Sequence, residues 1–228
     1  SFFLTAITNV VAADLKTNYL TFAISNRNVD ILHNETSDDT RFVSLNKNIS
    51  IPTFSLSIGA EKELLADQVI SFTVGGGVGG MFGRSKGDIP TRNLQYRDKA
   101  SGYSFSALGS LNGNFTIYKM RSQVFSGFHF LKSNSKFKLA YGPMNAASPA
   151  INIDYAEDGT QSFITAGLRF FDVKTELFSI IAIEYELTSS FNTSVDSSKI
   201  DKTKIGVTNP SKVEHNPYVV TLGFGMTF

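Results

Sequence analysis

The chain has 228 residues, which suit one domain or one barrel and are too few to divide comfortably into two domains. Its 21 Lys+Arg against 20 Asp+Glu leave no net field that would favour nucleic acid as a partner. The lack of cysteine excludes disulfides, thiolate metal sites and cysteine nucleophiles, and no apolar run reaches the roughly 20 residues of a membrane-spanning helix.

The first residues, SFFLTAITNVVAA, form an apolar run with a small-residue Val11-x-Ala13 pattern. This run is similar to the end of a signal peptide, although the basic start of such a peptide is missing. Two interpretations stay open: residues 1–16 are a retained segment, or they are a signal-peptide remnant. Under both, residues 17–228 are predicted to form a single barrel.

Alternation of apolar with small polar residues begins near residue 18 and is the strongest pattern in the chain. It predicts strands over 18–27, 52–62, 68–82, 102–117, 122–132, 136–142, 149–156, 161–171, 176–189 and 217–228. One face of most of these strands is large and apolar, while the other carries Ser, Thr and Gly. A soluble sandwich would usually place charged residues there, so the pattern indicates lipid on one side and a narrow lumen on the other.

One segment, 122–131, is ambiguous, since Val124, Phe128 and Phe130 compete with Phe125 and Leu131 for the outward face. The first set is predicted to face lipid. In 136–142, Phe137 and Leu139 are predicted to face lipid, and Lys136 and Lys138 therefore point into the lumen.

The last strand, YVVTLGFGMTF, places a regular row of apolar residues on one face: Tyr218, Val220, Leu222, Phe224, Met226 and Phe228. This ending resembles that of bacterial outer-membrane β-barrel proteins, whose last strand alternates and ends in Phe. The resemblance implies an integral barrel in the outer membrane of a Gram-negative envelope, with both termini in the periplasm. It also implies transient binding of this strand by the barrel-assembly machinery, and it would leave residues 1–16, if retained, in the periplasm or the lumen.

The fold class that follows is an all-β, transmembrane, antiparallel up-and-down barrel, and connectivity favours ten strands over eight. With ten strands, the long polar links 28–51, 83–101 and 190–216 all lie outside the cell, and the short turns ELLAD, YKMRS, GPMNAASP and DVKTE lie inside. Eight strands is the fallback, since it would require merging weak strands around Pro143 and Pro149.

Charged residues are predicted on the inward face of several strands. This lumenal set consists of Arg27, Glu61, His129, Lys136, Lys138, Asp154, Arg169, Glu184 and Glu186. In a narrow barrel such groups would pair across the lumen and block it. The alternative is that they line a path for solutes.

The predicted function is non-enzymatic: a structural or surface-interaction role through the extracellular loops, with no catalytic residue, cofactor or metal. The alternatives are a small passive porin-like channel and, more weakly, a surface hydrolase. Asp38-Asp39 and the Glu214-His215 pair do not reproduce the paired Asp and Asp-x-His pattern of barrel proteases.

The predicted partners are outer-membrane lipids and lipopolysaccharide, and a protein partner or a second copy of the chain is left open. Cations of one predicted loop, Arg84, Lys86, Arg92, Arg97 and Lys99, either neutralise lipid phosphates or form a solvated surface.

Overall fold

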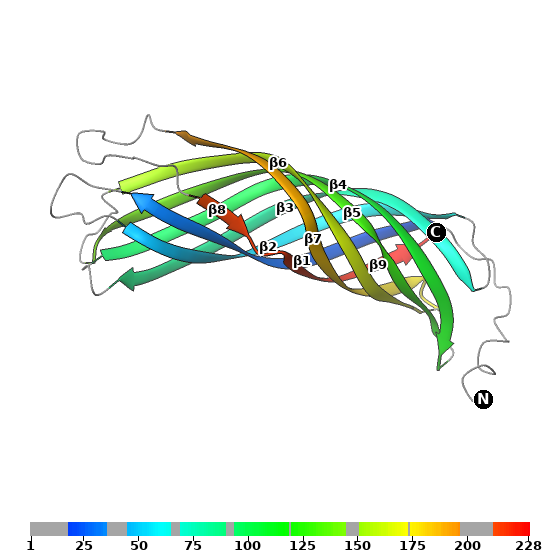
Figure 1. Ribbon diagram of the computed structural model, residues 1–228. Coiled ribbons are helices and arrows are strands. Elements are labelled where there is room, and N and C mark those ends of the chain that lie inside the picture. Colours follow the sequence, from blue (N-terminus) through cyan, green and yellow to red (C-terminus); the bar gives the residue numbers. More distant parts are fainter. Residues whose placement is uncertain are drawn as a thin grey trace, which may run out of the picture.

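The computed structural model describes residues 18–35, 45–64, 69–89, 94–118, 120–144, 151–172, 174–196 and 212–228. They form one antiparallel sheet of long, tilted strands (Figure 1). The strands are β1 (Asn18–Glu35), β2 (Leu45–Leu64), β3 (Ile70–Ile89), β4 (Leu94–Ile117), β5 (Met120–Pro143), β6 (Ile151–Phe171), β7 (Leu177–Asp196), β8 (Lys212–His215) and β9 (Tyr218–Thr227). The predicted segment 1–16 lies outside the described residues.

The sheet closes into a barrel at β1. This strand pairs with β2 along one edge and with both β8 and β9 along the other. β8 and β9 occupy one strand position that is interrupted at Asn216 and Pro217, where proline has no N–H to donate to a ladder. Each strand pairs with its neighbours in chain order, so the described residues form a ring of eight strand positions. The predicted antiparallel up-and-down barrel is confirmed.

The preferred count of ten strands is wrong, and the fallback of eight is correct. The predicted strands 122–132 and 136–142 are parts of β5, and 149–156 and 161–171 are parts of β6. Each pair of predicted strands is therefore one continuous strand, and neither pair is joined across Pro143 or Pro149. As a result, residues 144–150 join β5 to β6 at the end of the barrel opposite to the end of β9, and not on the side of the short turns.

The two ends of the barrel differ in their connections. Residues 65–69, 118–119 and 172–176 join strands at the end where β9 finishes, which we call the turn end. Residues 36–44, 90–93, 144–150 and 197–211 join strands at the opposite end, which we call the link end. Much of the predicted loops 28–51, 83–101 and 190–216 is strand, so the barrel continues well beyond the predicted strand ends.

The strands are longer than a membrane requires. β4 and β5 have 24 residues each, whereas about 9–11 residues of a tilted strand cross a bilayer. The large apolar side chains that are exposed on the outer wall gather toward the turn end, among them Phe22, Leu56, Phe72, Val78, Phe105, Leu111, Phe128, Ile164, Ile183 and Phe224. A continuous apolar belt of this kind is far larger than the patches that soluble monomers expose. The remaining strand length extends past the belt at the link end.

Close backbone contacts shape the wall formed by β2, β3 and β4. A Cβ atom on Gly77 would lie 2.5 Å from the carbonyl oxygen of Ile58, and one on Gly76 would lie 2.8 Å from that of Ser106. Glycine at these positions permits the approach of neighbouring strands, and at the inward position Gly77 it also leaves room in the lumen. No helix among the described residues is long and apolar enough to cross a membrane.

Candidate functional site in the barrel interior

A buried ion pair crosses the lumen near the turn end. The Arg169 guanidinium on β6 donates a hydrogen bond to the Glu61 carboxylate on β2, and the arginine side chain is only 1% exposed. The guanidinium also lies 4.5 Å from the centre of the Phe125 ring, so a cation–π contact adds to the ion pair. Because charges buried in a barrel must be paired, this contact fixes strands on opposite sides of the ring.

A second carboxylate, Glu63, extends this charged cluster. It accepts hydrogen bonds from Arg121 at 3.1 Å, from Gln123 at 3.0 Å and from the Tyr19 hydroxyl. The rings of Phe171 and Phe178 pack against the Tyr19 ring, and their own centroids are 5.0 Å apart. We call this set the charged layer: Tyr19, Glu61, Glu63, Arg121, Gln123 and Arg169, with Phe125, Phe171 and Phe178.

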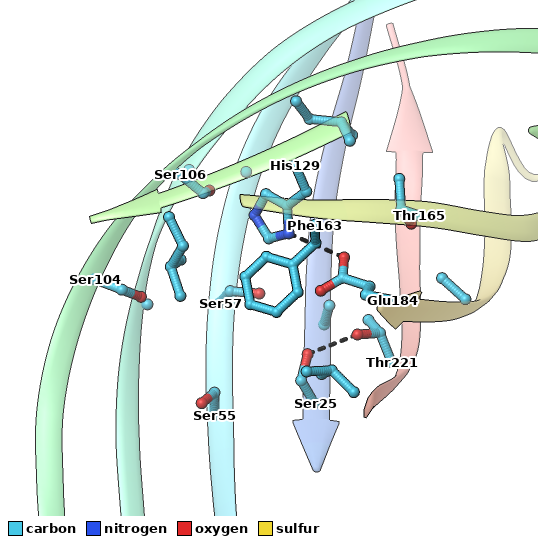
Figure 2. A pocket seen from close by; sticks show the side chains of 18 of the residues that line it. Ser25, Ser55, Ser57, Ser104, Ser106, His129, Phe163, Thr165, Glu184 and Thr221 are labelled. Carbon is cyan, nitrogen blue, oxygen red and sulfur yellow. Dashed lines mark hydrogen bonds and ion pairs between the residues drawn. The ribbon is translucent and has the colours of Figure 1, made fainter. Parts of the chain in front are cut away.

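The middle of the barrel contains a cavity of about 200 Å³. One wall carries small hydroxyl side chains, and Figure 2 shows Ser55, Ser57, Ser104 and Ser106 along it. On the other side, His129 Nδ1 and Glu184 Oε1 are 2.9 Å apart, and the Ser25 and Thr221 hydroxyls are 2.8 Å apart (Figure 2). The lining of the cavity therefore combines apolar surface, such as that of Phe163 and Ile180, with hydroxyl groups, and the ionisable groups lie on one side of the part drawn in Figure 2.

A second ion pair lies on the link side of this cavity. The Arg27 guanidinium donates to the Glu186 carboxylate and to the carbonyl oxygen of Asn216, the latter at 2.7 Å. Gln161 donates to the same carboxylate at 2.6 Å, and the Arg27 guanidinium lies 5.5 Å from the centre of the Phe163 ring. The pair therefore has partners that satisfy its remaining hydrogen-bonding groups, which a buried pair needs.

The lumen changes character toward the link end. Here the buried inward side chains are mainly apolar, and we call Val29, Ile51, Phe137, Leu139 and Tyr155 the apolar layer. The strand register joins its members, since Val29 pairs with Ile51 and Phe137 pairs with Tyr155.

One polar pair lies beside the apolar layer. His215 Nε2 is 2.9 Å from the Glu157 carboxylate, and the His215 ring stacks on Phe191. The lumen is thus filled at two levels by different side chains, with the cavity between them.

The structure places the predicted lumenal residues in two groups. Arg27, Glu61, His129, Arg169, Glu184 and Glu186 point inward, and they form the three pairs described above. The prediction for Lys136 and Lys138 is wrong, because both are exposed on the outer wall while Phe137 and Leu139 between and beside them are fully buried. Asp154 pairs in register with Lys138 and also lies on the outward side of β6.

Sequence reasoning missed part of the site because of its strand boundaries. Glu63 and Arg121 lie in the segments ELLAD and YKMRS, which were predicted to be turns, and the structure includes both residues in strands. His215 was predicted to lie in an external loop, yet it belongs to β8 and reaches Glu157. Asp38 and Asp39 lie outside the described residues. Inward alternation extended by a few residues would have found Glu63 and Arg121.

The residues of the predicted assembly strand all lie on the outer face of β9 or directly after it. Tyr218, Val220, Leu222, Phe224, Met226 and Phe228 are exposed, with Phe224 at 62%. Among the described residues, no group of three or more His, Asp or Glu side chains is arranged to hold a metal ion.

No family model matches the chain, and no curated protein matches it in sequence. Among solved structures, the chain is similar to the attachment invasion locus protein Ail of Yersinia pestis, with 15% identity, coverage of 93% of this chain and 99% of that one, and a TM-score of 0.37. It is also similar to Neisserial surface protein A, with 10% identity, coverage of 92% and 97%, and a TM-score of 0.37.

The outer-membrane protease OmpT of Escherichia coli is a further similar structure, with 9% identity, coverage of 96% and 99%, and a TM-score of 0.38. The chain therefore resembles bacterial outer-membrane β-barrel proteins over most of its length. These proteins differ in activity, and at such identities and TM-scores the similarity indicates no particular function.

Proposed function

We propose that the protein is an integral barrel of the bacterial outer membrane that conducts no solute and acts through its link end. The observation that carries the proposal is the double filling of the lumen, by the charged layer at one level and the apolar layer at another. A passive pore needs a continuous water path, and fully buried side chains at two separate levels are the opposite arrangement.

The exposed apolar belt supports the membrane location. Its rings and aliphatic side chains would be costly in water, whereas lipid would cover them, and the small polar lumen suits the same environment. Short turns usually lie on the periplasmic side of such barrels and longer loops outside the cell. We therefore place the turn end and the end of β9 in the periplasm, and the link end outside the cell.

The outer face of β9 supports the proposal that the barrel-assembly machinery binds this strand transiently. Its exposed apolar row is free to be recognised before the barrel closes against β1, as the ending in Phe228 implies for the assembly machinery. We propose no enzymatic activity, because His129 and His215 are each held by a glutamate at different levels of the lumen.

The second candidate is a small passive channel, and the cavity, with the ionisable groups in its lining, is the observation that favours it. For conduction, side chains of both layers would have to move and join the cavity to each end of the barrel. The His129–Glu184 and Arg27–Glu186 pairs would then face the path and set its ion selectivity.

Conductance of the purified protein in a planar bilayer tests the proposal. We expect no steady current steps from the parent protein, nor from Arg169→Ala, because the apolar layer remains filled in that variant. Steady conductance in the parent would contradict the proposal. In that case Arg27→Gln, an inward charge, should change the ion selectivity, while Lys62→Gln, an outward charge, should not.

A further inference from the structure

Basic side chains gather on one part of the outer wall, above the apolar belt on the link side. The exposed cations there are Arg84 and Lys86 on β3, Arg97 and Lys99 on β4, and Lys132, Lys136 and Lys138 on β5, and we call them the basic patch. These three strands are neighbours in the sheet, so the patch is continuous across them. Three outward acids adjoin it, Asp88 on β3 and Asp154 and Asp158 on β6, and Asp154 is the register partner of Lys138.

The strand register brings like charges directly together. Arg84 pairs with Lys99, and Lys99 pairs in turn with Lys138, which forms a row of three cations across three strands. Lys86 and Arg97 form a second directly opposed pair. Paired residues of neighbouring strands have Cβ atoms about 5 Å apart, and like charges at that separation destabilise a sheet. An anion that lies between the cations would offset this repulsion.

The height of the patch identifies where that anion would be. On β3, Arg84 is two residues beyond the exposed ring of Phe82, and on β5, Lys132 is two residues beyond that of Phe130. With a rise of about 3.4 Å per residue, the patch begins within about 7 Å along the strand of the last lipid-facing rings. This is the depth of lipid headgroups, because they occupy the layer directly beyond the hydrocarbon core.

The opposite side of the barrel shows no such clustering in the part that the structure describes. Outward positions beyond the apolar belt on β7 are Ser190, Asn192 and Ser194, those on β1 are Asn26, Asn28 and Asp30, and Glu214 on β8 is the register partner of Asp30. The charges named on that side are acidic, whereas a general requirement for solubility would distribute both signs of charge around the ring. The concentration of cations on β3, β4 and β5 therefore indicates a ligand on that side.

We propose that the basic patch binds the phosphate groups of phosphorylated glycolipid, such as lipid A, in the outer leaflet. Acyl chains would lie against the apolar belt below the patch, and the phosphates would lie between the paired cations, where charge-assisted hydrogen bonds are strongest. The inference rests on the membrane location and orientation given above, but it does not depend on whether the lumen conducts.

The test measures retention of lipid A by the folded protein in detergent micelles that contain EDTA, so that divalent cations cannot neutralise the phosphates. Bisphosphorylated lipid A is compared with its dephosphorylated form for the parent and for Lys99→Gln/Lys138→Gln. The matched control is Lys62→Gln/Lys174→Gln, which removes the same charge from exposed positions near the turn end. Circular dichroism of each variant establishes that it is folded.

We expect the parent to prefer the phosphorylated form, and the Lys99/Lys138 variant to bind it roughly tenfold or more weakly, since each cation near a charged lipid surface contributes about 1 kcal/mol. The control should bind like the parent, and added salt should weaken binding. Equal binding of both lipids, or an equal loss in the control, would overturn the inference. Preference for soluble polyphosphate over lipid A would contradict the claim that the bound phosphate groups belong to a lipid.

The two proposals can fail independently. A silent barrel without phosphate preference contradicts only the basic-patch inference. A conducting barrel that still prefers phosphorylated lipid A contradicts only the proposed closed lumen.

Discussion

The charged layer and the apolar layer fill the same lumen in different ways, the first with ion pairs packed among aromatic rings and the second with apolar side chains. Near the turn end the wall faces lipid, and the interior holds paired charges such as Arg169 and Glu61. Near the link end the outer wall carries Lys136 and Lys138, and the interior holds Phe137 and Leu139. One strand, β5, takes part in both arrangements.

In the membrane location proposed above, two solvents act on one barrel. In lipid, apolar side chains gain by pointing outward, so polar groups occupy the inside and must satisfy one another. In water the usual rule returns, and apolar side chains gain by pointing inward. On β5, the level at which the pattern reverses therefore marks the edge of the lipid belt.

The largest expected effect comes from breaking the charged layer. Arg169→Met leaves the Glu61 carboxylate buried without its ion-pair partner and removes the contact with Phe125. Loss of one partner of a buried pair costs about 3–5 kcal/mol, so the free energy of unfolding should fall by that order. Reversible urea unfolding in lipid vesicles measures it.

The rescue variant separates the charge from the packing. Adding Glu61→Gln to Arg169→Met removes the unpaired charge and should restore at least half of the lost free energy. A double variant that is no more stable than the single one would contradict a role for the buried carboxylate.

The apolar layer should be sensitive to lost volume in the way a soluble core is. Phe137 is fully buried, and Phe137→Ala should lower the free energy of unfolding by about 3 kcal/mol through lost burial and the cavity left behind. Its neighbour Lys136 is exposed, so Lys136→Ala should change the stability by no more than about 0.5 kcal/mol. Similar costs for the two variants would mean that the faces of β5 are not as described.

Cysteine labelling gives an independent measurement, since the chain has no cysteine of its own. A water-soluble maleimide should modify cysteine at 136 or 138 in the folded barrel and leave cysteine at 137 unmodified. Cysteine at 130 should be protected by lipid and become reactive in urea. Faster labelling at 137 than at 136 would contradict the assignment of residue 136 to the outer face and residue 137 to the interior.

The reversal of solvent explains how far the sequence could be interpreted. In the lipid belt, alternation correctly placed Phe128 and Phe130 outward, and it placed Arg169 and Glu184 inward. In 136–142 we made the same assumption, that apolar side chains face lipid. The residues predicted to point outward there, Phe137 and Leu139, point inward. A local signal was present but not used: the positions facing Phe137 and Leu139 are lysines, whereas most strands have Ser, Thr or Gly there, and charged facing positions are typical of a strand with water outside.

The same reversal produced the wrong strand count. In β5 the large apolar residues change from even positions, such as Phe130, to odd positions, such as Phe137, without any break in the strand. A change of phase resembles the start of a new strand, so one strand was interpreted as two. The pairings inside the lumen could not be predicted either, since Arg169 and Glu61 are brought together by the closure of the ring.

A smaller effect should distinguish the two faces of β3. A methyl group on Gly77 would collide with the carbonyl oxygen of Ile58, whereas one on Gly80 meets nothing closer than the Gly102 carbonyl oxygen at 3.9 Å. Gly77→Ala should therefore lower the free energy of unfolding by about 1–3 kcal/mol. Gly80→Ala should be neutral or stabilise the protein by up to about 1 kcal/mol. Equal effects would contradict the tight packing of the inner wall.

The smallest effect concerns the turn after β6, which belongs to neither layer. Asp172 accepts hydrogen bonds from the Lys174 backbone N–H at 2.9 Å and the Thr175 hydroxyl at 2.8 Å, and these bonds lower the pKa of its carboxyl group. A lowered pKa in the folded state means that the ionised carboxylate contributes stability above the unfolded pKa, near 4, and that this contribution disappears as the pH falls through the folded value. Asp172→Asn should thus unfold at a slightly lower urea concentration than the parent at pH 7, and the two midpoints should converge at low pH. A difference that persists or grows toward low pH would show that the turn depends on the shape of the side chain and not on its charge.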